Sequence, residues 1–484
     1  MKKEQAHPVF HGAEILKATD GIVISGAIDR IFCGVSTDTR QIHRGNLFIP
    51  LKGEKFNGHD FIADAVKTGA AGFLIQRGSE DKIPQRLEDA VVISVEDNLK
   101  ALGDIANFWR RHCKATIVAI TGSSGKTTTK EMIATIAGLS KNVSKASGNF
   151  NNLIGLPLSI FRINERHEIA ILEMGTNAPG EIGRLTRIAE PDIGLVTNIG
   201  PAHLEGLKSL DMVREEKMDL FRNMAESGIA VINLDDKKLL ISDADWRGEK
   251  VTFGLNTNAD VSAEKIKTRG VQGVSFTIKI GEFRQDIKMS TVGSHNIYNA
   301  LAAAASSWAL GIEYQTICQG LTAFQPVSGR MEIHRLNNGA FIINDTYNAN
   351  PASFRAALET LKNLKGDHES TVIMGDMLEL GDQAEELHEG IGSLMADTEV
   401  GTIFLRGRLS PATAAGALKK NMPKDQVFFF EKPEEILSRL SSYVKEGDWI
   451  LVKGSRQTKM EDTVGAIIEL FGTKKSKKIK RNCK

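Results

Sequence analysis

One short segment constrains the fold more than any other, because it joins a strand, a glycine-rich loop and a helix. Residues 116–121 form the β-branched, apolar run TIVAIT, and residues 122–125, GSSG, follow directly. Lys126 then opens a stretch with helical spacing. A strand that feeds a helix through such a loop is typical of an α/β domain with a parallel sheet. The segment therefore predicts an α/β fold for the region around it.

The loop itself has the composition of a phosphate-binding loop. Glycines let backbone N–H groups converge on an anion, and the N-terminus of the following helix adds the positive end of its dipole. The longer GxxxxGK[ST] pattern is not met, because Ile120 stands where its first glycine belongs, so an ordinary turn is the alternative interpretation. In the phosphate-binding interpretation, Lys126 neutralises the terminal phosphates and Thr127 ligates Mg²⁺. The predicted nucleotide-binding residues are Gly122, Ser123, Ser124, Gly125, Lys126, Thr127 and Thr128.

The chain is too long for one hydrophobic core. Its 484 residues predict three domains at about 100–200 residues per domain. A helix predicted over residues 97–112 ends the first unit, and the break at 326–329 separates two series of alternating strands and helices. We therefore predict α/β domains over residues 1–110, 111–325 and 326–470, followed by a disordered basic tail at 471–484. Buried strands are predicted at 169–174, 193–198, 229–233, 341–345, 371–374, 402–405 and 449–453.

Charge and composition argue against several classes of partner. The net charge of +1 gives no whole-chain field for nucleic acid or an anionic membrane. No stretch reaches the ~18 uncharged apolar residues of a membrane span, and the first ten residues lack the apolar core of a signal peptide. The four cysteines are far apart, which argues against a CxxC zinc or redox site and fits a reduced compartment. We therefore expect a cytoplasmic monomer without nucleic-acid or membrane partners.

The glycine loop and eight further segments resemble the Mur ligases, the amide-forming enzymes that extend the muramoyl peptide. They occur in family order over most of the chain: ITGSSGKTTTK (120–130), GNFNNLIGLP (148–157), LEMG (172–175), NIGPAHLEG (198–206), GSHNIYNA (293–300), GRME (329–332), NDTYNANP (344–351), GDMLELG (375–381) and VKGSR (452–456). Within the family, the sequence most resembles the members that add D-alanyl-D-alanine to UDP-N-acetylmuramoyl-tripeptide. The resemblance implies an N-terminal domain that holds the UDP-sugar, a central parallel-sheet ATPase domain and a Rossmann-like C-terminal domain.

The resemblance also implies the reaction. ATP phosphorylates the terminal carboxylate of the tripeptide, because a free carboxylate is a poor electrophile, and the amino group of D-alanyl-D-alanine attacks the acyl phosphate. A carboxylate crowded against a triphosphate places like charges together, so the site needs cations. ATP and two Mg²⁺ ions are the expected cofactors.

Five residues are expected to be catalytic: Lys126, Glu173, His203, Lys217 and Arg330. Glu173 ends an apolar strand, where a carboxylate faces the cleft beyond the sheet. Thr127, Glu173, His203 and Lys217 are the expected Mg²⁺ ligands. Lys217 lies at the spacing from His203 at which related ligases carry a lysine carbamylated by CO₂, and a solvated surface lysine is the alternative that remains open.

The remaining site residues follow from the same resemblance. Asn296 is expected to meet adenine, Arg330 the phosphates and Asp345 the ribose. The substrate residues are expected to be Tyr347, Asn348 and Asn350 for the D-alanyl-D-alanine or peptide side, Asn149 and Asn152 for the muramoyl peptide, and Ser36, Thr39 and Arg40 for the uridine nucleotide. The sequence STDTR at 36–40 departs from the Asp-Ser-Arg of many members, although Thr39 keeps the hydroxyl. Turn formation would also explain Asn350, since Pro351 follows it.

Three alternatives remain at this point. The first is another amide ligase of the Mur type, and the second is a folylpolyglutamate-type synthase. Those synthases begin near the phosphate loop, whereas this chain has about a hundred residues before it. The third is a nucleotide-gated binding protein on the same fold, against which the full set of catalytic candidates argues.

Overall fold

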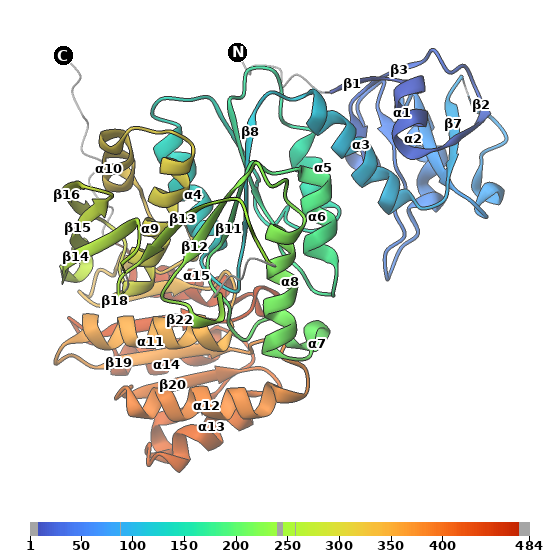
Figure 1. Ribbon diagram of the computed structural model, residues 1–484. Coiled ribbons are helices and arrows are strands. Elements are labelled where there is room, and N and C mark those ends of the chain that lie inside the picture. Colours follow the sequence, from blue (N-terminus) through green and yellow to red (C-terminus); the bar gives the residue numbers. More distant parts are fainter. Residues whose placement is uncertain (1–7, 88, 240–244, 257, 474–484) are drawn as a thin grey trace, which may run out of the picture.

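The computed structural model describes residues 8–87, 89–239, 245–256 and 258–473. This part of the chain forms three large sheets of five, nine and six strands, in sequence order along the chain, and one two-stranded pair. Figure 1 shows the N-terminal unit (blue) beside the central unit, and the C-terminal unit (orange to red) against another side of the central unit. The predicted three-part α/β architecture is confirmed, while the exact boundaries at residues 110, 325 and 470 stay a prediction. No described helix is long and apolar enough to cross a bilayer.

The N-terminal unit is a five-stranded sheet in the order β2-β7-β6-β5-β4, in which β4 to β7 run parallel. Helix α2 packs on one face, and helices α1 and α3 pack on the other. The elements are β1 (Val9–His11), α1 (Gly12–Thr19), β2 (Ile22–Ser25), β3 (Ile31–Cys33), β4 (Val35–Ser36), β5 (Leu47–Phe48), α2 (Ile62–Thr68), β6 (Gly72–Gln76), β7 (Val91–Val95) and α3 (Asn98–His112). Helix α3 begins where the Asp97 carboxylate accepts the Lys100 N–H at 2.8 Å, close to the start predicted for this helix.

The central unit is a nine-stranded sheet in the order β16-β15-β14-β13-β12-β11-β8-β10-β9. Strands β9 to β13 form a parallel core together with β8, and β14 to β16 extend it as antiparallel hairpins. The strands are β8 (Thr116–Thr121), β9 (Val143–Lys145), β10 (Ile169–Glu173), β11 (Ile193–Val196), β12 (Ile229–Asn233), β13 (Glu249–Gly254), β14 (Val261–Thr268), β15 (Val274–Ile280) and β16 (Phe283–Met289). The helices are α4 (Lys126–Ala137), α5 (Gly155–Ile160), α6 (Glu181–Ala189), α7 (Leu204–Leu207), α8 (Leu210–Arg222), α9 (Ser294–Ala309) and α10 (Tyr314–Ala323).

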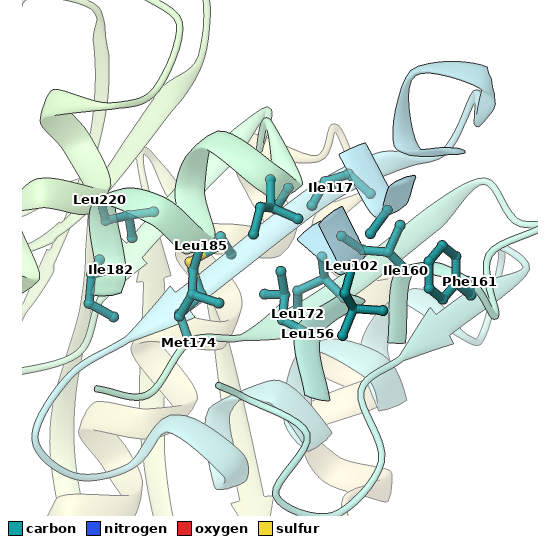
Figure 2. Close-up of a cluster of buried hydrophobic side chains, with 14 of the residues drawn as sticks. Leu102, Ile117, Leu156, Ile160, Phe161, Leu172, Met174, Ile182, Leu185 and Leu220 are labelled. Atoms are coloured by element: carbon teal, nitrogen blue, oxygen red, sulfur yellow. The ribbon is translucent and has the colours of Figure 1, made fainter. Parts of the chain in front are cut away.

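The alternation of side chains along β8 explains how this sheet is covered on both faces. Ile117 and Ala119 belong to a core with α3, α5, α6 and α8, while Val118 and Ile120 belong to a second core with α4, α9 and α10. Figure 2 shows the first core, where Leu102 of α3 lies among the side chains of α5 and β10. Each buried side chain of this size contributes about 1.5–3 kcal/mol. Helix α3 therefore joins the N-terminal unit firmly to the sheet that carries the phosphate loop.

The C-terminal unit is a six-stranded sheet in the order β17-β18-β22-β19-β20-β21, parallel except for the edge strand β17. Helices α11, α12 and α13 cover one face, and α14 and α15 cover the other. The elements are β17 (Glu332–Arg335), β18 (Phe341–Asp345), α11 (Pro351–Lys365), β19 (Ser370–Gly375), α12 (Ala384–Asp397), β20 (Thr402–Arg406), α13 (Ser410–Lys419), β21 (Val427–Phe429), α14 (Glu434–Tyr443), β22 (Trp449–Lys453) and α15 (Met460–Phe471).

The C-terminal unit extends slightly beyond the start predicted for the basic tail. Helix α15 ends at Phe471, which packs against the core of this unit, and Thr473 pairs with Leu336. The Asn337 N–H also donates to the Gly472 carbonyl at 3.1 Å. Residues 471–473 are therefore part of the folded unit rather than of a disordered tail. Residues 474–484, which hold the basic cluster, lie outside the described residues.

Candidate active site

A cavity of about 1090 Å³ lies between the central and C-terminal units, where loops follow the carboxyl ends of both parallel sheets. Sixteen of the predicted site residues line it: Ser123, Ser124, Gly125, Lys126, Thr127, Thr128, Asn149, Asn152, Glu173, His203, Asn296, Arg330, Asp345, Tyr347, Asn348 and Asn350. The predicted residues that do not line it are Gly122, Lys217, Ser36, Thr39 and Arg40. The cavity thus gathers side chains from segments more than 200 residues apart.

The phosphate loop is held in shape by its own Lys126 and by Thr197, which directly follows strand β11. Gly122 and Gly125 have φ values of +143° and +81°, which favour glycine, and a Cβ atom on Gly122 would lie 1.9 Å from Thr197 Oγ1. The Thr197 hydroxyl donates to the Ser124 carbonyl at 2.6 Å. Lys126 Nζ donates to the Gly122 carbonyl at 2.6 Å, and burial lowers the pKa of this lysine. Hydrogen bonds within the protein therefore hold the loop in the shape of an anion-binding turn.

We expect Gly125→Ala to impair nucleotide binding more than folding. A Cβ atom there would lie 2.3 Å from Asn299 Oδ1, and the left-handed backbone adds about 1–2 kcal/mol of strain. Gly311→Ala is the matched control, because Gly311 has φ +72° but nothing within 4 Å of the added Cβ. Calorimetric titration with a nonhydrolysable ATP analogue should show weakened binding for Gly125→Ala alone. Equal binding by both variants would contradict the assignment of the loop.

A chain of polar contacts links the loop to the C-terminal unit through Glu173. The Thr127 hydroxyl donates to Glu173 Oε2 at 2.8 Å and accepts from Arg330 Nη2 at 2.7 Å. Asn151 Nδ2 donates to Glu173 Oε1 at 3.1 Å, and Lys130 Nζ lies 3.9 Å from Glu173 Oε2. Glu173 is 4 % exposed, so its carboxylate relies on these donors. Arg330 therefore reaches the phosphate loop, and its predicted contact with the phosphates stays a prediction.

The donors at this point fit Mg²⁺. Hydroxyl and carboxylate oxygens are the ligands that Mg²⁺ prefers, usually one or two carboxylates together with phosphate oxygens. In the described part of the chain, no group of three or more His, Cys, Asp and Glu side chains forms a complete metal cage. Thr127 and Glu173 thus offer a partial site, of the kind that a bound nucleotide completes.

His203 touches the C-terminal unit. It precedes α7 with a φ of +57°, and its Nδ1 lies 2.7 Å from Glu379 Oε2. The Glu379 carbonyl also accepts the Glu205 N–H at 3.1 Å. The contact between the His203 imidazole and the Glu379 carboxylate is the main reason that the pKa of Glu379 is lowered. The loop after β19 therefore docks on the loop that carries His203.

Lys217 is buried, so the surface-lysine alternative is wrong. Its side chain lies in α8 at 1 % exposure and does not line the cavity. Burial first, and then the nearby Lys126 cation, lower its pKa to about 7. No hydrogen bond or ion pair joins this amine to another described residue. The neighbouring Glu216 does not pair with Lys217. Its carboxylate instead accepts the N–H groups of Gly180 and Ile182 at 2.6 and 2.7 Å.

The predicted adenine and ribose residues are held by protein contacts. Asn296 Nδ2 donates to the Val292 carbonyl at 2.7 Å, and its Oδ1 accepts from Asn299. Asp345 Oδ2 accepts from the buried Lys453 ammonium at 2.5 Å. Beside them, burial lowers the pKa of His295 to about 4, so this histidine is neutral near pH 7. These contacts fix the orientation of both predicted nucleotide-binding groups.

Four predicted substrate asparagines and Tyr347 line the same cavity. Asn350 is the N-cap of α11, since its Oδ1 accepts the Ser353 N–H at 2.8 Å, and its Nδ2 donates to the Ser123 carbonyl at 3.2 Å. Asn350 thus begins a helix, which the sequence analysis did not predict, and also contacts the phosphate loop, while its role toward the substrate stays a prediction. Asn152 Oδ1 likewise accepts the Gly155 N–H at 2.8 Å at the start of α5. The Tyr347 ring lies 4.0 Å from the Arg330 guanidinium carbon.

The remaining predicted substrate residues lie in the N-terminal unit, at the carboxyl end of β4. Arg40 pairs with Asp38 through two nitrogens at 2.8 and 2.9 Å, and the pKa of Asp38 is lowered mainly by this hydrogen bonding. Ser36 Oγ donates to the Asp38 carbonyl at 2.9 Å, which shapes the turn. Ser36, Thr39 and Arg40 thus form a compact group apart from the cavity, and their uridine-binding role stays a prediction.

Several residues with clear contacts in the site were not among the predicted ones: Asn151, Asn198, Glu379 and Lys453. Each belongs to one of the segments that carry the family resemblance, so a signal existed at the level of the segment. Their contacts join different segments, and spacing along the chain does not reveal such contacts. Tyr298 also lines the cavity, and its hydroxyl donates to Asp235 at 2.9 Å. Its place in the segment 293–300 was the only indication of such a role in the sequence.

Comparisons with known proteins cover nearly the whole chain. Residues 32–110 match the model described as Mur ligase family, catalytic domain; residues 120–307 match the Mur ligase middle domain; and residues 329–456 match the model described as Mur ligase, glutamate ligase domain. The chain is 37% identical over 436 residues to the UDP-N-acetylmuramoyl-tripeptide–D-alanyl-D-alanine ligase of Bacillus subtilis, covering 90% of this chain and 93% of the relative.

Solved structures agree with this result. The crystal structure of MurF from Acinetobacter baumannii has a TM-score of 0.87 and 29% identity, covering 96% of this chain and all of that one. MurF from Thermotoga maritima, crystallised with ADP, has a TM-score of 0.79 and 27% identity, covering 90% of this chain and 97% of that chain. Similarity thus extends over all three units, including the N-terminal unit. The chain therefore belongs to the Mur ligase family of amide-forming ligases.

Proposed function

We propose that this ligase joins D-alanyl-D-alanine to UDP-N-acetylmuramoyl-tripeptide, with hydrolysis of ATP to ADP and phosphate, in the assembly of the peptidoglycan precursor. The observation that carries the proposal is the cavity in which the phosphate loop of the central unit faces Arg330 and Asp345 at the start of the C-terminal unit. The named function of relatives that are similar over 90% of the chain supports the choice of substrates. We place the reaction in the cytoplasm and expect a monomer, which sedimentation velocity would test.

In the first step, a tripeptide carboxylate oxygen attacks the γ-phosphorus of ATP, and ADP leaves. Lys126 belongs to the phosphate loop, and Arg330 contacts the Thr127 hydroxyl of this loop from the C-terminal unit. Both cations offset the charge that develops where carboxylate and triphosphate meet. In the second step, the amine attacks the acyl phosphate, loses a proton and expels phosphate, which forms the amide.

Thr127, Glu173, His203 and a carbamate on Lys217 are the residues that we propose to hold Mg²⁺. When bound, Mg²⁺ neutralises charge on the phosphate oxygens. The buried, unpaired Lys217 amine supports carbamylation, because only the neutral amine captures CO₂. Asn151 and Lys130 keep the Glu173 carboxylate in place from the other side.

The experiment that tests the function measures phosphate release with ATP, Mg²⁺ and D-alanyl-D-alanine. UDP-muramoyl-tripeptides with diaminopimelate or lysine at the third position should be compared, since the sequence does not choose between them. We expect phosphate release that depends on all three substrates, and a product that gains one dipeptide by mass. Phosphate release at the same rate without the dipeptide would contradict the proposal.

A further inference from the structure

The cavity contains four lysine and arginine side chains, and three of them are held by neighbouring groups. Lys126 donates to the Gly122 carbonyl, Arg330 donates to the Thr127 hydroxyl, and the buried Lys453 pairs with Asp345. Arg456 is the fourth. Its side chain is 64% exposed, and its ion pair is with Glu461, a partly exposed carboxylate in α15 at 2.9 Å. Exposed pairs of this kind are weak and exchange easily with a ligand.

The backbone that carries Arg456 is held firmly. Arg456 opens the short η8 turn (Arg456–Thr458), directly after the buried Ser455. The Ser455 hydroxyl accepts the Leu378 N–H at 2.9 Å, and the Ser455 N–H donates to the Asp376 carbonyl at 3.0 Å. Gly454 lies so close to its neighbours that a Cβ would be 2.6 Å from Thr458 Oγ1. An exposed guanidinium on a firmly held turn suits recognition of a ligand that enters from solvent.

Tyr347 lies near both cavity arginines of the C-terminal unit. Its ring lies 4.0 Å from the guanidinium carbon of Arg330 and 6.0 Å from that of Arg456. Arg330 contacts the Thr127 hydroxyl of the phosphate loop, whereas Arg456 pairs with Glu461 of α15. Arg456 therefore lines the cavity from the C-terminal unit, together with Asn348 and Gln457.

We propose that Arg456 recognises the free carboxylate of the incoming D-amino-acid dipeptide, an inference that rests on the proposed function. The amino group of the dipeptide reacts at the phosphate end, while its carboxylate stays ionised in the product. This carboxylate enters a cavity already lined by Glu173, Asp345 and Glu379, so it needs a cation of its own. The guanidinium fork binds a carboxylate with two parallel hydrogen bonds, which Arg456 gains by releasing Glu461. Arg456 is thus a specificity-determining residue.

The test compares D-alanyl-D-alanine with D-alanyl-D-alaninamide, which lacks the negative charge. For the unmodified enzyme we expect kcat/KM for the amide to be lower by about ten- to hundred-fold, the range of a charge-assisted hydrogen bond. Arg456→Ala should lower kcat/KM for the acid by the same factor and leave the amide unchanged, so that discrimination disappears. Arg456→Lys should retain part of the discrimination between the acid and the amide. The KM values for ATP and UDP-tripeptide should stay within about two-fold, well below the tenfold that 1.4 kcal/mol represents.

Two control variants complete the design. Lys459→Gln removes a nearby exposed cation that does not line the cavity, and discrimination should persist. Glu461→Gln removes the partner of Arg456, and the KM for the dipeptide should stay equal or fall. An Arg456→Ala enzyme that still discriminates, or whose KM rises for UDP-tripeptide instead, would overturn the inference. Absence of dipeptide turnover in the unmodified enzyme would instead count against the proposed function.

Discussion

Lys126→Ala is expected to lower the rate of ligation by about 10²–10³-fold or more while the protein stays folded. The Lys126 ammonium sits at the start of α4, within the loop, where it offsets charge transferred with the γ-phosphoryl group. It also closes the loop through its bond to the Gly122 carbonyl, so both kcat and nucleotide affinity should fall. Steady-state phosphate release gives the rate, and circular dichroism checks the fold.

Lys141→Ala is the control for this variant. Lys141 follows α4 in the same unit, but its side chain is 45% exposed and pairs with Glu168 on the surface. An exposed pair contributes about 0–1 kcal/mol, so we expect turnover close to that of the unmodified enzyme. Turnover by Lys126→Ala at the level of this control would remove Lys126 from the catalytic set.

Much of the fold was predictable, because the buried strands have a strong local signal. The predicted strands at 116–121, 229–233, 341–345 and 449–453 coincide with β8, β12, β18 and β22. Parallel strands that are buried on both faces read as continuous apolar, β-branched runs, and helices that alternate with them leave few other topologies. The hairpins β14 to β16 were not predicted, because five of the eight residues of β14 are exposed and largely polar.

The site was predictable by segment but not by contact. Thr127 and Arg330 are bonded across 203 positions, and the pair of His203 and Glu379 is formed by two different units. Local pattern says nothing about how two domains lie relative to each other. The buried state of Lys217 was equally hidden, since EEKMD reads as a solvated helix segment.

Lys217→Ala and Lys217→Arg are both expected to lose activity, and only Lys217→Ala should recover when formate or acetate is added. Mg²⁺ prefers anionic oxygen ligands, and an ammonium at this position would repel the metal that a carbamate attracts. Arginine stays charged and does not form the carbamate. The buried Lys217→Ala variant leaves space in which a small carboxylate can bind. We expect the rate of ligation to fall by about 10²-fold or more, which is the scale for losing an electrostatic group at a catalytic centre.

Lys217→Met is the matched control, because methionine fills the space of the lysine stem without an amine. This variant should stay folded and inactive, and carboxylates should not restore it, since the space is occupied. Thermal unfolding checks the three variants for stability. Rescue of Lys217→Met by formate would mean that the carboxylate acts elsewhere.

The pH dependence follows from the pKa of about 7 for Lys217. Because burial lowers this pKa, the amine is mostly charged at pH 6 and mostly neutral at pH 8, and only the neutral form reacts with CO₂. At low bicarbonate concentration, the activity of the unmodified enzyme should therefore rise between pH 6 and 8, and added bicarbonate should raise it further. The carbamate carbon should give a ¹³C signal after exchange with labelled bicarbonate, and this signal should be absent from Lys217→Met. If Lys217→Arg has normal activity and no such signal appears, Lys217 is an ordinary buried cation. In that case, Glu173 and the substrate phosphates would be the only anionic ligands of Mg²⁺ among the proposed groups.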